Sequence, residues 1–256
     1  MPAVLKIPVL ILCLFVLLVP SIATPEEGEV RDMTEDMVLI PAGVFSQGCD
    51  QFGPQHGAPT QRVFLHAFMI DKYEVTNEQF EVLFPEHRLR RSKFSNCDRC
   101  PVSKVSWYEA ADYCHIVGKA LPSEAQWERA AGPGNGCDFP WGPTFEPDKN
   151  QARGGLKLKD NAAPVGSYPP NQHGIHDMAG NMWEWVGDWF SIDFYHLGDL
   201  YNPRGPSSGM MKVRRGGSWS AKRGARGRMP PALTSSGRRS RSPTRRTQRG
   251  PSYVPP

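Results

Sequence analysis

Six cysteines carry the most distinctive chemistry that this 256-residue sequence could perform. Cys97 and Cys100 form a C-x-x-C motif, which can hold a zinc ion, act as a redox pair or form a structural disulfide. A zinc site needs a second pair of ligands, and no further C-x-x-C or H-x-x-x-H motif follows. A redox pair needs a thioredoxin-like βαβ context, which the surrounding sequence lacks. We therefore expect a structural disulfide of this pair or of its members.

The N-terminus predicts the compartment of these thiols. Residues 1–23 combine Lys6, a nearly continuous apolar run over residues 7–19 and small residues at Ser21 and Ala23, which is typical of a secretory signal peptide. A membrane anchor would need roughly 20 apolar residues, more than this run offers. We expect a secreted or periplasmic protein that begins near Thr24 and has no membrane contact after cleavage.

Export places the remaining cysteines in oxidising surroundings, where disulfides form and persist. Cys13 leaves with the signal peptide, and the odd number that remains leaves at least one thiol free or paired with another chain. The remaining cysteines are Cys49, Cys97, Cys100, Cys114 and Cys137.

Two histidines are the other candidate metal ligands. His173 and His176 lie three residues apart, a spacing that could bind a metal ion on a helix. They stand in a glycine-rich turn with no third ligand nearby in the sequence, so we interpret them as surface histidines. His56 and His66 have no partner pattern either. The sequence contains no P-loop, GxGxxG or HExxH motif.

The net charge of +4 conceals two regions of opposite sign. Residues 222–256 contain ten Lys and Arg and no acidic residue, whereas all 26 acidic residues lie in residues 24–221, whose net charge is −7. A basic tail on an acidic body is not typical of a nucleic-acid-binding domain, so we expect no nucleic-acid partner.

Three capping boxes predict short helices, since each pairs Ser or Thr with Glu or Gln three residues later. They begin at Thr76, Ser106 and Ser123. Apolar and alternating stretches predict strands over residues 37–45, 61–74 and 212–219. The 25 Gly and 25 Pro favour turns over long elements.

We divide the chain into a signal peptide (1–23), a polar leader (24–37), one domain (38–221) and a basic, disordered tail (222–256).

An ordered set of segments resembles the formylglycine-generating enzyme, or sulfatase-modifying factor, family. The set spans about Val38 to Trp219, and its sharpest parts are DMAGNMWEW and RGGSW; the others are VLIPAGVF, FMIDKYEVTNEQF, CPVSKVSWYEAADYC, GKALPSEAQWERAA, FPWG and APVGSYPPNQHGIH. The resemblance implies a compact α+β, C-type lectin-like fold with little regular secondary structure.

The catalytic chemistry of that family does not fit this sequence. The resemblance implies oxidation of a cysteine in an unfolded sulfatase to formylglycine, with oxygen and a copper ion held by two thiolates just after RGGSW. The two thiolate positions fall here on Ala221 and Arg226, and neither offers the soft sulfur that copper(I) prefers. No copper is expected. The composition changes abruptly near residue 222, through either a divergent tail or a frameshift.

The segment from Asp177 to Glu184 matches a calcium site of the family. The resemblance assigns side-chain oxygens to Asp177 and Glu184 and main-chain oxygens to Gly180 and Met182. Calcium takes six to eight hard oxygens, and a glycine lets the backbone bend so that carbonyls can serve as ligands. The alternative is a tight turn whose acids cap local amides.

A second family calcium site is less complete here. Asn150 and the carbonyl of Gln151 could supply part of it, but the expected acid aligns with Lys157, and Asp160 is only nearby. A cation at a ligand position argues against binding, so we expect this site to be lost or remodelled.

Two functional hypotheses follow. The first is an exported sulfatase-modifying-factor-like protein without copper-dependent activity. The second is a non-catalytic module on a C-type lectin-like scaffold that binds a peptide, protein or sugar. Four tryptophans could stack against a ligand, but we interpret most of them as core residues; they are Trp183, Trp185, Trp189 and Trp219.

Overall fold

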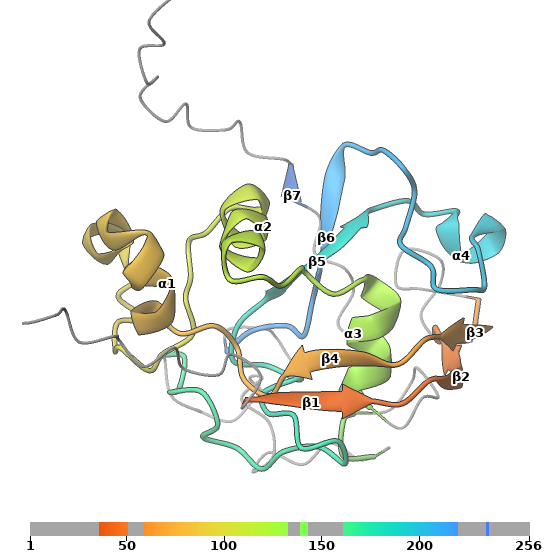
Figure 1. Ribbon diagram of the computed structural model, residues 1–256, viewed down its shortest axis with the longest axis horizontal. Helices are drawn as coiled ribbons and strands as arrows, with labels where there is room; N and C mark the ends of the chain where they lie inside the picture. The colour runs from red at the N-terminus through yellow and green to blue at the C-terminus, as the bar shows by residue number, and fades with distance from the viewer. Residues whose placement is uncertain (1–35, 51–58, 133–138, 143–160, 220–233, 236–256) are drawn as a thin grey trace, which may run out of the picture. The chain divides into compact units, whose positions relative to one another are not determined.

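The computed structural model describes residues 36–50, 59–132, 139–142, 161–219 and 234–235, all within the unit Met33–Pro256 (Figure 1). Within these residues no helix is long and apolar enough to cross a membrane. Several predicted features fall outside the described residues: the signal peptide 1–23, nearly all of the leader, His56, Cys137, Asn150, Gln151, Ala221 and Arg226.

The first half of the domain supplies two short antiparallel strand pairs. Strand β1 (Met37–Ile40) pairs with β4 (Phe68–Asp71), and β2 (Gly43–Gln47) pairs with β3 (Gln61–Leu65). The single strand predicted over residues 37–45 is in fact two strands. The break falls at Pro41, because proline has no N–H to donate to a strand ladder.

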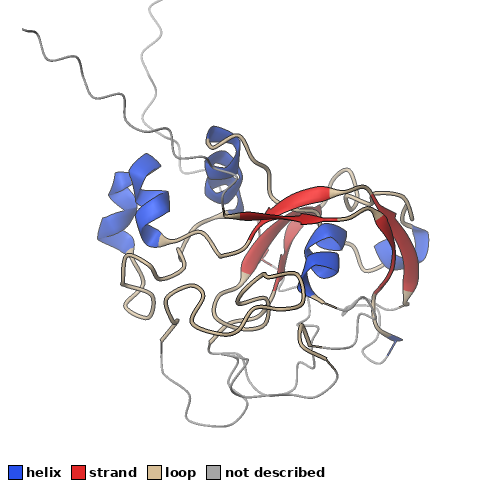
Figure 2. Cartoon of the chain, turned by 60° about the horizontal axis from the view of Figure 1, so that its bottom comes forward, coloured by secondary structure: helices blue, strands red, loops and turns tan. Residues whose placement is uncertain are grey.

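All three predicted capping boxes are present. Three helices begin directly after Thr76, Ser106 and Ser123: α1 (Asn77–Leu83), α2 (Trp107–Ile116) and α3 (Glu124–Ala131). In each case the N-cap side chain accepts a hydrogen bond from the backbone N–H of the N3 residue. The N3 side chain returns a hydrogen bond to the N-cap backbone, which satisfies a second free donor. Two shorter helical segments are η3 (Pro85–Arg90) and α4 (Phe194–Leu197). Figure 2 shows how much loop lies between these elements.

The second half contributes a sheet that the sequence predicted only in part. Strand β6 (Met211–Arg215) lies between β5 (Glu184–Trp189) and β7 (Thr234–Ser235). β6 falls within the predicted strand 212–219, whereas β5 was not predicted. β7 belongs to the segment predicted as a disordered tail, and at these two residues the structure instead shows antiparallel pairing with Met211 and Lys212.

The main core lies between α3 and strands β1, β5 and β6. Trp127 and Ala130 of α3 pack with Ile40, Val186 and Val213. Beside this core Arg215 of β6 lies buried at 1% exposure. Its guanidinium bonds Glu124 at 2.8 Å and Glu128 at 2.9 Å, which ties α3 to β6.

The four tryptophans interpreted mostly as core are half-buried. Three of them pack against cations of β6: the Lys212 Nζ atom lies 3.9 Å from the ring centroid of Trp189, and the Arg214 guanidinium lies over Trp183 and Trp185. The rings therefore cover the flank of the β5–β6 pair rather than fill the interior.

Candidate metal site and adjoining pocket

The loop predicted to hold calcium runs from Asp177 to the first residue of β5, and its backbone is tightly wound. Asp177, Gly180 and Asn181 have positive φ angles of 60°, 105° and 52°. Two backbone bonds, each of 2.9 Å, attach the loop to the chain that follows β6: Gly180 N–H donates to Gly216, and Trp219 N–H donates to Asn181. The two sharpest motifs of the sequence thus form one structural unit.

Both predicted carboxylate ligands have one satisfied oxygen and one buried oxygen without a partner. Asp177 Oδ2 accepts from the Gly166 amide at 2.7 Å, and Glu184 Oε2 accepts from the Trp127 indole at 2.8 Å. Asp177 Oδ1 and Glu184 Oε1 are buried and have no hydrogen-bond partner. A buried carboxylate oxygen without a donor is costly, and a bound cation would remove that cost.

Gly216 lines a small space beside two of the predicted ligand atoms. A Cβ atom at this position would lie 3.5 Å from Glu184 Oε1 and 3.6 Å from the Met182 carbonyl oxygen. Both atoms therefore border the same volume, which the absent side chain of Gly216 leaves open. Its φ of 86° also favours glycine.

Glu74, which the sequence analysis missed, joins these acids from the segment after β4. Its carboxylate accepts from the Met182 amide at 3.0 Å and from the Asn181 side chain at 2.5 Å. It therefore attaches the loop to the segment after β4. We refer to Glu74, Asp177 and Glu184 as the carboxylate cluster.

The three acids of the carboxylate cluster resist ionisation together. Burial, Glu184 and Asp177 raise the pKa of Glu74 well above its usual value. Burial, with a further contribution from Asp177, raises the pKa of Glu184 to about 7. Burial also raises the pKa of Asp177. Among the described residues, no Lys or Arg forms an ion pair with any of them.

These residues fit a hard cation bound by two carboxylates and two main-chain oxygens. Within the described residues, no group of three His, Cys, Asp or Glu side chains could hold a metal ion by itself. The predicted set differs from such a group, because two of its four residues contribute carbonyl oxygens.

The histidines near the loop have structural contacts instead. His176, interpreted from the sequence as a surface residue, is half-buried, stacks on Tyr73 and has Nδ1 2.8 Å from the Tyr168 carbonyl. His173 is also half-buried, and burial and Arg129 lower its pKa. His66 is exposed.

The described cysteines provide one thiol. Cys97 and Cys100 form a disulfide, which confirms the expectation for the C-x-x-C motif, and Cys49 is also disulfide-bonded. Cys114 of α2 is free and half-buried. Burial, with a contribution from Asp71, raises the pKa of its thiol to about 11, so the thiolate that binds soft metals is scarce at neutral pH.

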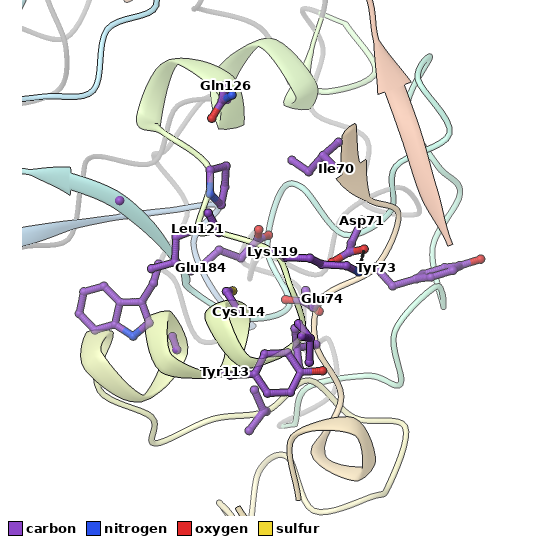
Figure 3. A pocket seen from close by; sticks show the side chains of 18 of the residues that line it. Ile70, Asp71, Tyr73, Glu74, Tyr113, Cys114, Lys119, Leu121, Gln126 and Glu184 are labelled. Atoms are coloured by element: carbon purple, nitrogen blue, oxygen red, sulfur yellow. Dashed lines mark hydrogen bonds and ion pairs between the residues drawn. The ribbon is translucent and has the colours of Figure 1, made fainter. Parts of the chain in front are cut away.

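Next to the carboxylate cluster lies a pocket of about 790 Å³. Its walls come from β4, α2, the segment of residues 117–122 and β5, and Figure 3 shows Glu74, Cys114 and Glu184 around it. Asp188 of β5 also lines it, and burial together with Glu124 raises the pKa of Asp188 to about 7. An ion pair of 2.6 Å between Lys119 and Asp71 joins two of its walls.

Comparison with known proteins places this arrangement in context. Residues 22–250 match the sequence profile of the sulfatase-modifying factor enzyme 1-like domain. The chain is 30% identical over 245 residues to the formylglycine-generating enzyme of Mus musculus, which covers 72% of this chain and 66% of that protein. It is 28% identical to the inactive C-alpha-formylglycine-generating enzyme 2 of Bos taurus, over 73% of this chain and 77% of that protein.

A longer relative is similar in sequence, and two solved structures are similar in fold. The serine/threonine-protein kinase pkn1 of Chlamydia pneumoniae is 36% identical over 77% of this chain, which spans only 35% of that kinase's length. PvdO from Pseudomonas aeruginosa superimposes with a TM-score of 0.63 at 21% identity, over 78% of this chain and 88% of its own. Treponema denticola variable protein 1 superimposes with a TM-score of 0.62 at 26% sequence identity, over 78% of this chain and 91% of its own. These likenesses confirm the predicted α+β fold.

Proposed function

The chain belongs to the sulfatase-modifying factor enzyme 1-like family, and on that basis we propose that it is an exported member without copper-dependent formylglycine-generating activity. The proposal combines three features: the predicted signal peptide 1–23, the residues at the two thiolate positions, and the state of the described cysteines. One relative at 28% identity is itself described as inactive.

The observation that carries the proposal is the lack of a thiolate pair. The positions that the resemblance assigns to copper ligands hold Ala221 and Arg226. Of the cysteines in the described residues, only Cys114 is a thiol, and its raised pKa keeps it protonated. Copper(I) prefers soft thiolate ligands. Ala221, Arg226 and Cys114 do not provide a pair of thiolates.

A peptide-oxidation assay tests this function. The purified full chain is incubated with copper(I), oxygen and a sulfatase-type cysteine peptide, and the product is read by mass. We expect no formylglycine above the blank. Turnover would overturn the proposal, and turnover that disappears in Cys114→Ser but persists in Cys97→Ser would place the chemistry at α2.

The export component has its own test. If residues 1–23 are a signal peptide, the protein purified from its natural compartment begins near Thr24. Mass spectrometry of the intact protein measures this directly. A retained Met1, or protein recovered only from membranes, would contradict export of a soluble mature chain.

The second candidate function is a binding module whose loop is clamped by calcium. Asp177 and Glu184 would supply carboxylate oxygens, and Gly180 and Met182 would supply carbonyls. The buried carboxylate oxygens without partners support this proposal, since both belong to predicted ligands. Calcium would supply the positive charge that the carboxylate cluster lacks and so hold the loop against the segment after β6. The pocket of about 790 Å³ beside it is large enough for a ligand.

A further inference from the structure

Strand β4 leaves one backbone edge open. Lys72 N–H donates to the Asp36 carbonyl at 2.8 Å, so this residue pair is hydrogen-bonded across β1 and β4. Because such pairs alternate along an antiparallel ladder, the N–H and C=O groups of Met69 and Asp71 point away from β1. Among the described residues, no other strand pairs with β4.

The pocket is lined by strand β4 and by the connection between α2 and α3. All four residues of β4 line the pocket, as do Ala120 and Leu121 from the connection between α2 and α3 (Figure 3). The connection between α2 and α3 is attached to β5, since Gly187 N–H donates to the Pro122 carbonyl at 2.8 Å. A strand placed beside β4 would meet the outward-pointing N–H and C=O groups of Met69 and Asp71.

The side chains around the pocket favour apolar and cationic groups. Its floor includes Phe68 and Ile70, whose side chains alternate along β4 with the exposed Met69. Four carboxyl groups line it, and burial raises the pKa values of three of them, Glu74, Glu184 and Asp188. The acid that a cationic group would meet beside the edge of β4 is therefore Asp71, which is partly exposed. Residues 24–221 as a whole carry a net charge of −7.

We propose that this groove binds an extended basic and apolar segment of a partner polypeptide, which adds a strand to the open edge of β4. Alternate apolar side chains of the segment enter the pocket beside Ile70, and its Lys or Arg side chains lie on the face of Asp71. The Lys119–Asp71 ion pair across the mouth is partly exposed, so its opening costs little. The inference rests on the second function proposed above, a ligand-binding module.

The basic tail of the chain itself is a poorer occupant. Residues 236–256 contain four prolines, each without the N–H that a strand ladder needs: Pro243, Pro251, Pro255 and Pro256. A second copy of the acidic domain would bring like charges together. A cationic strand from another protein meets neither objection.

The test measures binding of a fluorescein-labelled eight-residue peptide of alternating valine and lysine to the full chain by polarisation. Two protein variants are compared. Met69→Pro removes the N–H at the open edge of β4, whereas Leu39→Pro removes its counterpart on the outer edge of β1, directly across the pair. We expect Met69→Pro to weaken binding at least tenfold and Leu39→Pro to change it less than twofold.

Peptide variants keep the test decisive even if Met69→Pro does not fold. With the unmodified protein, N-methylation of every second peptide amide should weaken binding at least tenfold, and an alternating valine–glutamate peptide should bind at least tenfold more weakly than valine–lysine. Equal binding of the N-methylated or the glutamate peptide overturns the proposal.

Two further outcomes would assign the groove to another occupant. Displacement of the probe by a synthetic peptide of residues 236–256 would assign it to the tail, and dimerisation abolished by Met69→Pro would assign it to a second copy. Either overturns the proposal. Neither affects the oxidation assay, so failure at the groove leaves the proposed loss of copper chemistry intact, and turnover in that assay leaves the groove result intact.

Discussion

Two clusters of buried acids are connected through Trp127, and within the part of the chain that the structure describes only one of them contains a cation. The Trp127 ring packs against Arg215, and its indole N–H donates to Glu184. In one, Glu124 and Glu128 bond the buried guanidinium of Arg215. In the other, the carboxylate cluster of Glu74, Asp177 and Glu184 has no such cation among the described residues. Glu184 and Arg215 are cross-strand neighbours, yet the guanidinium donates to Glu124 and Glu128.

The difference appears in the ionisation of the two clusters. Although burial lowers the pKa of Arg215, Glu128 and Glu124 raise it above its usual value, so the guanidinium stays charged and paired with both acids. In the carboxylate cluster the pKa values of all three acids are raised. The first cluster is therefore complete by itself, and the second requires protons or an external cation.

The largest expected effect comes from removing the internal cation. Arg215→Met leaves Glu124 and Glu128 buried without their partner, and breaking a buried pair in this way costs about 3–5 kcal/mol. Urea denaturation at pH 7 measures the loss of unfolding free energy. The matched control is Arg214→Met, at the half-buried neighbouring position. Equal losses in the two variants would contradict a special role for the Arg215 cluster.

The next effect should come from supplying the missing external cation. Calcium at 100 times its dissociation constant would stabilise the native state by about 2.7 kcal/mol, or roughly 5–10 °C in Tm for a domain of this size. Asp177→Asn and Glu184→Gln should lose the increment. Asp71→Asn, a carboxylate variant in the pocket but outside the cluster, should keep it.

Thermal unfolding with calcium, with magnesium and with chelator measures the difference. Melting that is equal with calcium and with chelator would show that the carboxylate cluster is completed by protons alone.

The sequence indicated members of the carboxylate cluster only where they are close together in the chain. Asp177, Gly180, Met182 and Glu184 occupy one short segment and were identified together. Glu74 was missed, because it reaches Met182 across 108 residues and nothing in its own neighbourhood marks it as part of a site. The three helix starts were correct, since a capping box is complete within four residues.

Strand β5 was not predicted, because its alternation of polar and apolar residues is the reverse of that expected for a half-buried strand. Its buried side includes Asp188 at 3% exposure next to Val186, while Trp185 and Trp189 lie half-exposed on the other face. Alternation that places an acid inside and aromatics outside does not read as a half-buried strand. The long-range pairing with β6 determines the strand, and the sequence alone does not reveal that pairing.

A third, smaller effect concerns pH in the presence of chelator. Glu184 has a usual pKa of 4.5 in the unfolded chain and about 7 when folded. Between these values the native state binds more protons, so the unfolding free energy falls as pH rises through this window. Glu184→Gln should remove this cost and stabilise the protein on the order of 2 kcal/mol at pH 8.

At pH 4 the variant and the unmodified chain should differ little in chelator, since Glu184 is then neutral in both states. Saturating calcium should reverse the sign at pH 8, because the variant loses a charged ligand. Urea denaturation at both pH values measures this, and a variant less stable than the unmodified chain at pH 8 in chelator would contradict the raised pKa.

The smallest effect concerns Trp127, which contacts both Arg215 and Glu184. The Trp127 ring packs under Arg215, with the guanidinium 5.1 Å from its centroid, and its indole N–H donates to Glu184. Trp127→Phe keeps an aromatic ring beside Arg215 but removes the donor. The loss of packing is independent of pH, whereas the hydrogen bond matters most when Glu184 is ionised. In chelator, the destabilisation should therefore be about 1 kcal/mol larger at pH 8 than at pH 5. Trp185→Phe is the control, because that indole donates to the neutral carbonyl of Val105 and its effect should not depend on pH. If the two variants show the same pH dependence, the Trp127 bond does not distinguish the clusters, and the carboxylate cluster holds its charge by other contacts.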